Sequence, residues 1–254
     1  MSVAPSLAGA AWLREGPAAE VLSLLDRDGE EARVVGGAVR NALMGLPVGE
    51  IDIATTALPE TVMARGRAAG FKTVPTGIEH GTVTLVIDGQ PVEVTTLRQD
   101  VETYGRKAKV AFGRDWAGDA ARRDFTINAL SVAPDGTVHD TVGGLADIAA
   151  RRVRFIGDPA TRLAEDYLRI LRFFRIHAAF GAGDLDRPAL LACIAAREGL
   201  AALSAERIRM EMLKLMVAPG APDALVAMDD GGLLVRILGG VAYHGALAAM
   251  IEVE

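Results

Sequence analysis

The chain has 254 residues, of which 50% are apolar and 24% charged, and its formal net charge is −6. This composition is ordinary for a globular protein of one large or two small domains. No apolar run is long enough to cross a bilayer, the first residues lack the blocks of a secretory signal, and the negative charge argues against a general polyanion binder. The only cysteine, Cys193, excludes an intramolecular disulfide and suggests a reducing cytoplasm.

The first half of the chain alternates short β-branched runs with glycine-rich turns, which predicts a mixed α/β region. Between the runs Thr82–Ile87 and Pro91–Leu97, Asp88-Gly89-Gln90 is typical of a β-hairpin turn. The stretch Gln99–Gly118 has few apolar residues and several Gly, Arg and Lys, so it is interpreted as a mobile loop. The predicted strands are Ala32–Val35, Ile51–Ala54, Thr82–Ile87, Pro91–Leu97 and Asn128–Ala133.

After about Ala149 the pattern becomes helical. Asp158-Pro159 supplies an N-cap and a first helical residue, and Ser204 opens a further helix. Gly245–Glu254 is interpreted as a last helix that stops without a cap signal. We therefore expect a head of about residues 25–150 and a helical part over 151–254. One continuous helix is indicated by the spacing of Leu163, Tyr167, Ile170, Leu171, Phe174 and Ala178.

A glycine pair stands between a predicted strand and a predicted helix. Gly36 and Gly37 would let backbone N–H groups approach an anion, with Arg40 one turn into the helix. Taken alone, a glycine pair at this position is better explained by a tight turn.

Acidic residues fall on two predicted strands. Glu50 and Asp52 are two residues apart and share a face, and their mutual repulsion would be relieved by a cation such as Mg²⁺. Glu93, on another strand, would complete a site for two metals. An edge strand with a solvent-facing acidic side explains each of these residues equally well.

Arginines are concentrated between residues 151 and 175, a stretch that contains seven arginines and only three acidic residues. Asp166, Arg169 and Arg172 recur at a spacing of three on the predicted helix. An exposed helix face with ion pairs of about 0.2–0.5 kcal/mol each is the alternative interpretation. The sequence contains no GxxxxGK[ST], HExxH, paired CxxC or GxSxG motif, and its four histidines lack metal-ligand spacing.

Taken together and in order, these motifs resemble class II tRNA nucleotidyltransferases, the CCA-adding enzymes, which are grouped with bacterial poly(A) polymerases in the polymerase-β-like superfamily. The resemblance covers about Val34 to Leu215, and its specificity lies in the combination. It implies an α+β fold, with a polymerase-β-like head (a mixed sheet with flanking helices) followed by an all-helical neck and partial body. The motifs are GGAVRNALMG, EIDIATTALPE, GIEHGTVTLVI, VEVTTLR, RRDFTINAL, GGLADIAARRVRFIGDP and EDYLRILRFFR.

The resemblance also implies roles for individual residues. The triphosphate would be held by Gly36, Gly37 and Arg40, the metal by Glu50 and Asp52, and Glu93 would be the carboxylate of the adjacent strand. Arg123 and Asp124 would face the nucleotide, with Asp124 near the ribose. Asp166 and Arg169 would contact the base, and Arg172 and Arg175 would add phosphate contacts. The cofactor would be Mg²⁺ in a two-metal site, with ATP, CTP and tRNA as substrates.

The proposed base contacts can be checked by their chemistry. A carboxylate that accepts from an exocyclic amine and a guanidinium that donates to a ring nitrogen suit both cytosine and adenine. Uracil and guanine present the opposite pattern, and a site left unpaired in this way discriminates by about 10⁴-fold or more. In the implied reaction the tRNA 3′-hydroxyl attacks the α-phosphorus and releases pyrophosphate. In relatives the segment equivalent to Gln99–Gly118 helps to switch from C to A addition.

Two positions depart from the family pattern. Asn41 stands where many relatives have Asp, and Glu50 stands where the first metal-binding Asp is usual. The extra methylene of Glu50 moves its oxygens by about a bond length, and catalysis is sensitive to shifts of ~1 Å. Poly(A) polymerase, a CC-only or A-only adding enzyme and a non-catalytic RNA-binding module are the alternatives. Relatives continue into a helical body and tail that grip tRNA; most of these regions are expected to be missing here, which predicts normal nucleotide binding and weak tRNA anchoring.

Overall fold

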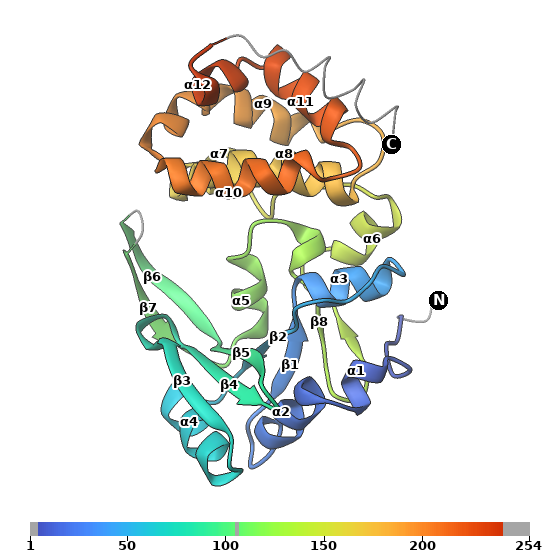
Figure 1. The fold of residues 1–254 in the computed structure, drawn as a ribbon, viewed down its shortest axis with the longest axis vertical. Helices are drawn as coiled ribbons and strands as arrows, with labels where there is room; N and C mark the ends of the chain where they lie inside the picture. Colours follow the sequence, from blue (N-terminus) through green and yellow to red (C-terminus); the bar gives the residue numbers. More distant parts are fainter. Residues whose placement is uncertain (1–4, 105–106, 241–254) are drawn as a thin grey trace. The chain divides into compact units, whose positions relative to one another are not determined.

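A computed structural model describes residues 5–104 and 107–240 of the chain, which divides into two compact units, Met1–Ile148 and Ala149–Glu254 (Figure 1). The first unit starts before the expected boundary at residue 25. Helices α1 (Ala11–Arg14) and α2 (Pro17–Leu25) precede the first strand, and residues of both helices are buried in the core of this unit. The apolar face of α2 is the physical reason, because it covers the sheet.

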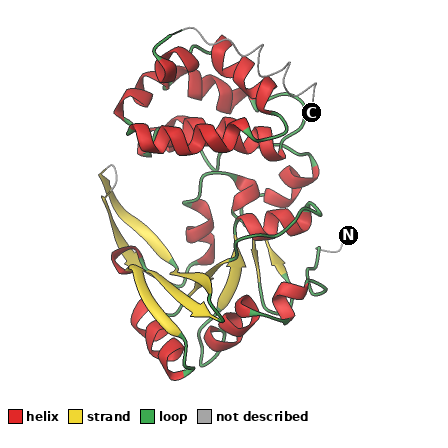
Figure 2. Ribbon diagram, viewed as in Figure 1, coloured by secondary structure: helices red, strands yellow, loops and turns green. Residues whose placement is uncertain are grey.

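The first unit is built on a seven-stranded mixed sheet in the order β3-β4-β5-β2-β1-β8-β9. This confirms the predicted α+β class, and Figure 2 shows the strands in yellow. Four predicted strands are found within one residue of their expected bounds. The fifth, expected over 128–133, is reduced to two residues, and its expected first residue belongs to a 3₁₀ turn over residues 126–128. The strands are β1 (Ala32–Val35), β2 (Asp52–Thr55), β3 (Lys72–Gly77), β4 (Thr82–Ile87), β5 (Gln90–Thr96), β8 (Ser131–Val132) and β9 (Val138–His139).

The predicted hairpin turn joins β4 to β5. Asp88 has φ 48° and Gly89 has φ 79°, and Ile87 pairs directly with Gln90. Two consecutive residues with positive φ are what a two-residue hairpin loop needs, because their twist matches that of the flanking strands. The local sequence therefore fixes this register.

The two faces of the central strands differ in chemistry. Val34, Ile53 and Val94 belong to the main core, to which α2 and α4 (Pro59–Ala68) contribute Leu22 and Val62. Side chains alternate along a strand, so the preceding residue on each of these strands points to the opposite face. The sheet thereby directs its polar positions away from the core that the two helices cover.

The interpretation of Gln99–Gly118 as a loop is wrong for most of its length. Residues Arg98–Tyr104 (β6) and Lys107–Phe112 (β7) form a two-stranded antiparallel sheet, and Trp116–Ala121 form helix α5. The low apolar content was misleading because Val101, Thr103 and Val110 are β-forming residues whose propensity suffices for a paired ribbon.

The second unit contains helices and no strand element within its described residues (Figure 1). Helix α8 contacts α7, α10 and α11, and its apolar face carries Ile170, Leu171 and Phe174. No helix in residues 5–104 or 107–240 has the length and hydropathy of a membrane span. The predicted helix over 245–254 lies outside the described residues. The helices are α7 (Pro159–Glu165), α8 (Leu168–Phe180), α9 (Arg187–Ala195), α10 (Ala205–Met216), α11 (Ala221–Asp230) and α12 (Leu234–Leu238).

The helix predicted to run continuously from Asp158 is interrupted. The start is confirmed, since the Asp158 side chain accepts a hydrogen bond from the Thr161 N–H at 2.8 Å. The helix ends at Glu165, however, and Asp166 is extended, with φ −158° and ψ 108°. Its carboxylate accepts from the Leu168 N–H at 3.1 Å, which starts a second helix. An Asp side chain competes with the backbone in this way, and a hydrophobic repeat does not report it.

Candidate active site

Strand β1 leads into the glycine pair, and Gly36 has φ 75° before helix α3 (Gly37–Leu43) begins. A Cβ at Gly36 would lie 3.4 Å from Nη1 of Arg123, and one at Gly37 would lie 3.4 Å from Nη2 of Arg40. The positive φ at Gly36 disfavours any other residue. The two glycines therefore allow two guanidinium groups to lie close against the backbone at this turn.

Arg40 is 7% exposed, which is unusual for an arginine and indicates a fixed side chain. Its Nε and Nη2 donate to Oδ1 of Asn41 at 3.1 and 2.8 Å, and its Nη1 donates to Oδ1 of Asn128. The side chain is thus held by amide oxygens from the helix that carries it and from the turn before β8.

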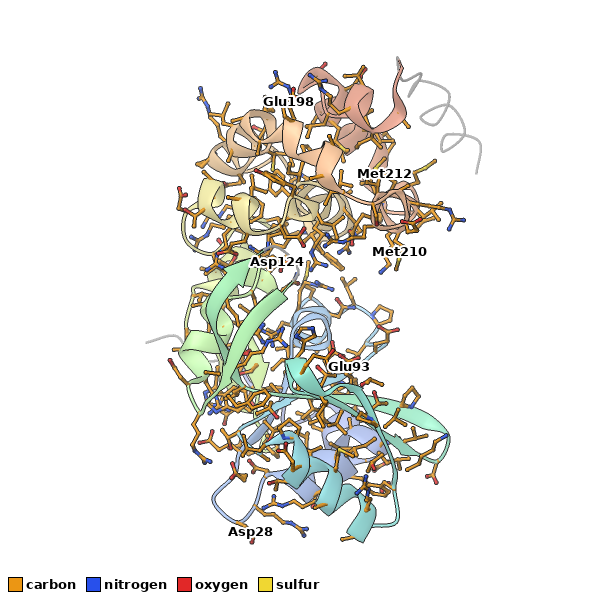
Figure 3. The ribbon with its side chains drawn as sticks, turned by 90° about the vertical axis from the view of Figure 1, so that its left-hand side faces the viewer. Asp28, Glu93, Asp124, Glu198, Met210 and Met212 are labelled. Atoms are coloured by element: carbon orange, nitrogen blue, oxygen red, sulfur yellow. The ribbon has the colours of Figure 1, made fainter. Side chains whose placement is uncertain are left out.

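The strand carboxylates are brought together by the sheet register. Asp52 and Glu93 are direct partners in the parallel pairing of β2 with β5, and Val35, which precedes Gly36, is the partner of Asp52 on the other side. Asp52 and Glu93 are both exposed and lie on the face opposite to Ile53 and Val94. Figure 3 marks Glu93 among the side chains of the first unit. The glycine turn and two carboxylates therefore meet on three adjacent strands.

Glu50 does not lie on the strand where it was expected. Strand β2 begins at Asp52, and Glu50 is an exposed residue of the segment before it. The shared strand face of Glu50 and Asp52 is therefore wrong as a description of their geometry. Glu50 precedes Asp52 by two residues, and its negative charge raises the pKa of Asp52 and of Glu93.

Both strand carboxyl groups have raised pKa values. For Asp52, partial desolvation at the sheet contributes most, the charge of Glu50 adds to it, and the guanidinium of Arg123 opposes it. Desolvation also raises the pKa of Glu93, followed by the charges of Asp52 and Glu50. Mutually repelling carboxylates of this kind gain most from a bound cation.

Arg123, whose charge acts on Asp52, is held by an acidic residue of α5. The buried Asp119, 3% exposed, accepts from Nε and Nη2 of Arg123 at 3.4 and 3.2 Å, and from Arg122 at 2.6 Å. Asp124 is 8% exposed and accepts from the Phe125 N–H at 2.9 Å. Asp124 is labelled in Figure 3.

In the second unit Asp166 pairs with a residue from another helix. Nη2 of Arg207 on α10 donates to Oδ2 of Asp166 at 2.6 Å. Burial would raise the pKa of Asp166, but the hydrogen bonds from Arg207 and from the Leu168 N–H outweigh it, so the pKa is lowered. The carboxylate thus stays ionised and acts as an acceptor only.

The other candidates of this unit are also held by neighbouring groups. The Arg169 guanidinium donates to Glu165 and to the Arg162 carbonyl oxygen, whereas the Arg169 backbone N–H donates to the Asp166 carbonyl oxygen at 3.0 Å. From α10, the buried Glu211 accepts from Nε of Arg175 and lies 4.0 Å from Nη1 of Arg172. The two groups of candidate residues belong to different compact units.

Comparison with known proteins identifies the family of the chain. The family described as Poly A polymerase head domain matches residues 32–154, and the family described as Probable RNA and SrmB-binding site of polymerase A matches residues 185–243. The chain belongs to the tRNA nucleotidyltransferase and poly(A) polymerase family.

Several relatives in this family carry names of CCA-adding enzymes. The CCA-adding enzyme of Geobacillus thermodenitrificans is 41% identical over 86% of the chain and 54% of its own length. The mitochondrial CCA tRNA nucleotidyltransferase 1 of Homo sapiens is 42% identical over 76% of the chain and 45% of its own length. The crystal structure of the Bacillus stearothermophilus CCA-adding enzyme in complex with CTP has a TM-score of 0.80 and 38% identity. The match covers 91% of the present chain and 55% of the crystallised one. The chain spans about half the length of these relatives.

Sequence analysis of this family member missed Asp119, Asn128, Arg207 and Glu211. Asp119 stands four residues before Arg123, and Arg207 and Glu211 stand four apart on one helix. The spacing of four between Asp119 in α5 and Arg123 just after it therefore offered a signal for Asp119. The other contacts join residues far apart in the chain, so no local pattern identifies them.

The head of this family member has donors suited to a hard cation. Within residues 5–104 and 107–240, no group of three or more His, Cys, Asp or Glu side chains is arranged to hold a metal by itself. Mg²⁺ is usually bound by one or two carboxylates together with substrate phosphates and water. Asp52 and Glu93, as direct strand partners beside the glycine turn, fit that requirement.

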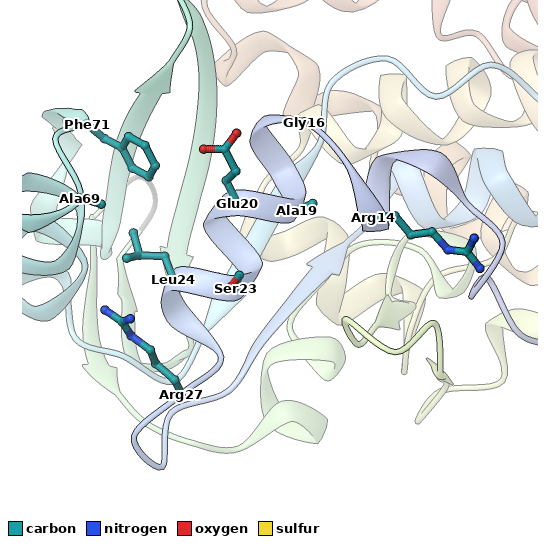
Figure 4. Close-up of a pocket in the computed structure, with 9 residues that line it drawn as sticks. All are labelled: Arg14, Gly16, Ala19, Glu20, Ser23, Leu24, Arg27, Ala69 and Phe71. Carbon is teal, nitrogen blue, oxygen red and sulfur yellow. The ribbon is translucent and has the colours of Figure 1, made fainter.

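A shallow groove elsewhere on the head lies along α2. It has a volume of about 410 Å³ and includes Glu20, Leu24 and Phe71 (Figure 4). None of the candidate catalytic or nucleotide-binding residues of this family member lines it, so the groove is separate from the cluster around Asp52.

Proposed function

We propose that this chain adds CMP and AMP to the 3′ end of tRNA without a template, using CTP and ATP and releasing pyrophosphate. The observation that carries the proposal is the parallel register of Asp52 with Glu93 beside Gly36, in a chain of this family. Relatives named as CCA-adding enzymes support it, as does a solved tRNA nucleotidyltransferase described with a primer tRNA and an incoming ATP analogue, which is 25% identical with a TM-score of 0.72.

In this proposal the residues of the head bind and orient the nucleotide. The backbone at Gly36 and Gly37 and the guanidinium groups of Arg40 and Arg123 hold the triphosphate, because both arginines lie against that turn. Asp124 faces the ribose. The carboxylates of Asp52 and Glu93 orient the attacking 3′-hydroxyl toward the α-phosphorus.

The proposed cofactor is Mg²⁺, held by Asp52 with Glu50 and assisted by Glu93. When bound at such a site, a pair of these ions lowers the pKa of the attacking hydroxyl and neutralises the leaving phosphates. The raised pKa values of the Asp52 and Glu93 carboxyls support this assignment, since a cation between these groups offsets their repulsion.

Base selection is assigned to Asp166 and Arg169. The ionised Asp166 accepts from the exocyclic amine of cytosine or adenine, and Arg169 donates to the adjacent ring nitrogen. Arg207 supports this role, because its hydrogen bond lowers the pKa of Asp166 and keeps it an acceptor. Arg172 and Arg175 are assigned phosphate contacts, with Glu211 as their present partner.

We also propose a reducing compartment, such as the cytoplasm, for the chain. Cys193 is the only cysteine and is buried in α9, where burial raises the pKa of its thiol. A buried, protonated thiol is unreactive and needs no disulfide partner.

Two alternatives, one enzymatic and one not, each have a specific observation in their favour. The matching head family is described as that of a poly(A) polymerase, which favours repeated AMP addition. A non-catalytic RNA-binding module is favoured by the position of Glu50 outside β2. An enzyme that adds only CC or only A is a third alternative.

Incorporation of labelled nucleotide into tRNA that lacks its CCA end, with Mg²⁺ present, separates these functions. We expect CMP and then AMP to be added, followed by arrest, and we expect Asp52→Asn to abolish both. Continued AMP addition would indicate a poly(A) polymerase, and addition of one nucleotide type alone would indicate the partial enzymes. No incorporation with Mg²⁺ or Mn²⁺ would contradict an enzymatic function.

A further inference from the structure

Asn41 joins two parts of the head that the proposed reaction uses. Its Oδ1 accepts from Nε and Nη2 of Arg40 at 3.1 and 2.8 Å, and its Nδ2 donates to the carbonyl oxygen of Pro47 at 2.8 Å. A single side chain thus contacts both the arginine beside the glycine turn and the segment that precedes Glu50.

The chemistry of the partners fixes the orientation of the Asn41 amide. A guanidinium only donates and a backbone carbonyl only accepts, so the oxygen must face Arg40 and the nitrogen must face Pro47. An aspartate at this position would keep the contact with Arg40. Its second oxygen would, however, lie against the Pro47 carbonyl oxygen, where two acceptors repel each other.

The segment held by Asn41 leads directly to the carboxylates. The Leu46 N–H donates to the Asn41 carbonyl oxygen at 2.8 Å, and Gly45 turns the chain with φ 68°. Three residues after Pro47 the chain reaches Glu50, whose charge acts on Asp52 and Glu93. A displacement of the Pro47 peptide is therefore expected to move the segment before β2 that carries Glu50.

We propose that Asn41 is a positioning residue that sets Glu50 relative to Arg40 through the Pro47 carbonyl. The inference rests on the proposed function and extends it to a residue that touches neither substrate nor metal. The hydrogen bond closes the segment from Asn41 to Pro47, and Glu50 follows three residues later.

The variant Asn41→Asp removes only the donor and retains the acceptors for Arg40. We expect the affinity of the protein–CTP complex for Mn²⁺, measured from the EPR signal of free Mn²⁺, to fall about three- to tenfold, as for one lost positioning hydrogen bond. The Mg²⁺ concentration that gives half-maximal CMP incorporation should rise by a similar factor. The added negative charge alone would strengthen cation binding, so the predicted sign separates positioning from simple electrostatics.

The controls test whether the effect passes through Glu50. Gln90→Glu adds the same charge at the exposed end of β5 and should leave Mn²⁺ affinity unchanged. In a Glu50→Gln background, Asn41→Asp should have no further effect on Mn²⁺ affinity. Pro47→Gly keeps the carbonyl oxygen but makes the segment more flexible, so it should also weaken Mn²⁺ binding. This variant replaces Asn41→Asp in the test if circular dichroism shows that Asn41→Asp is unfolded.

Unchanged Mn²⁺ affinity in Asn41→Asp, or an equal loss with and without Glu50, would overturn the inference. The Mn²⁺ readout does not need catalysis. If wild-type protein fails to incorporate CMP, the proposed function fails while the EPR result still decides the role of Asn41. If CMP is incorporated and Asn41→Asp behaves as wild type, only the inference about Asn41 fails.

Discussion

Three carboxylates share one small region of the head, and their energetics follow from that proximity. Asp52 and Glu93 are strand partners, and both have raised pKa values because desolvation and neighbouring negative charge disfavour ionisation. The folded state therefore binds protons at this site more tightly than the unfolded chain does. Stability from these groups is present at low pH and is lost as the pH rises through their folded-state pKa values.

Replacing Glu50 by Gln should make the remaining carboxyls easier to ionise. In metal-free protein, carboxyl ¹³C NMR titration should show lower apparent pKa values for the Asp52 and Glu93 pair than in wild type. Both carboxyls should show the fall, because the charge of Glu50 raises the pKa of each. Glu79→Gln, an exposed neutralisation on another turn, is the control. Unchanged titration in Glu50→Gln would place Glu50 away from the cluster.

At the level of single residues, the sequence predicted Asp52 and Glu93 as strand carboxylates because both lie in strongly β-forming runs. It could not predict their direct pairing, since that depends on which strands are neighbours. Glu50 was misplaced because the alternation of acidic and apolar residues continues past the point where the backbone pairing stops. Asp119 was missed because its partner Arg123 was predicted only to face the nucleotide.

Among the elements, the β4–β5 hairpin depends on its turn. Replacing Gly89 with Ala should destabilise the protein by about 1–2 kcal/mol, because the position requires φ 79° and a Cβ disfavours the left-handed region. No atom lies within 4 Å of the added Cβ, so the cost is conformational rather than steric.

Gly113→Ala is the matched control, since that glycine also has open space but no positive φ. Urea unfolding of the two variants measures the difference. An equal effect of the two substitutions would contradict the role given to the turn.

The pairing of α10 with the α7–α8 turn gives a second prediction at this scale. Replacing Arg207 with Ala removes the hydrogen bond that holds the Asp166 carboxylate and should raise the KM for CTP and ATP about tenfold, with a smaller change in kcat. Arg209→Ala, an exposed change on the same helix, should be neutral. Arg207→Lys should recover part of the loss because it restores a donor. Equal behaviour of the Arg207 and Arg209 variants would remove Arg207 from the site.

Most elements could be predicted because their signals are local: the β-branched runs, the Asp88-Gly89 turn and the Asp158-Pro159 helix start. The β6–β7 ribbon was missed because its low apolar content predicted a loop, although several of its residues favour strands. The break at Asp166 was missed because the hydrophobic repeat continues across it. Both errors have the same cause: the hydrogen bonds that form the β6–β7 pair and that interrupt the helix at Asp166 leave no trace in the apolar pattern.

On the scale of the whole molecule, the chain combines two compact units with different tasks in the proposed reaction. The first, Met1–Ile148, carries the carboxylates and the glycine turn, and the second carries Asp166 and Arg169. The net charge of −6 means that affinity for nucleotides must arise from local arginine clusters rather than from overall charge. The chain covers about half the length of relatives such as the Geobacillus thermodenitrificans enzyme.

The choice between nucleotides tests the central claim most directly. The measurement is kcat/KM for each of CTP, ATP, UTP and GTP, with tRNA acceptors that end one step before C or before A. We predict that CTP and ATP are used on their respective acceptors and that UTP and GTP are rejected by about 10⁴-fold or more. Asp166→Asn should reduce that discrimination. Use of UTP or GTP within about tenfold of CTP by wild-type protein would contradict the account.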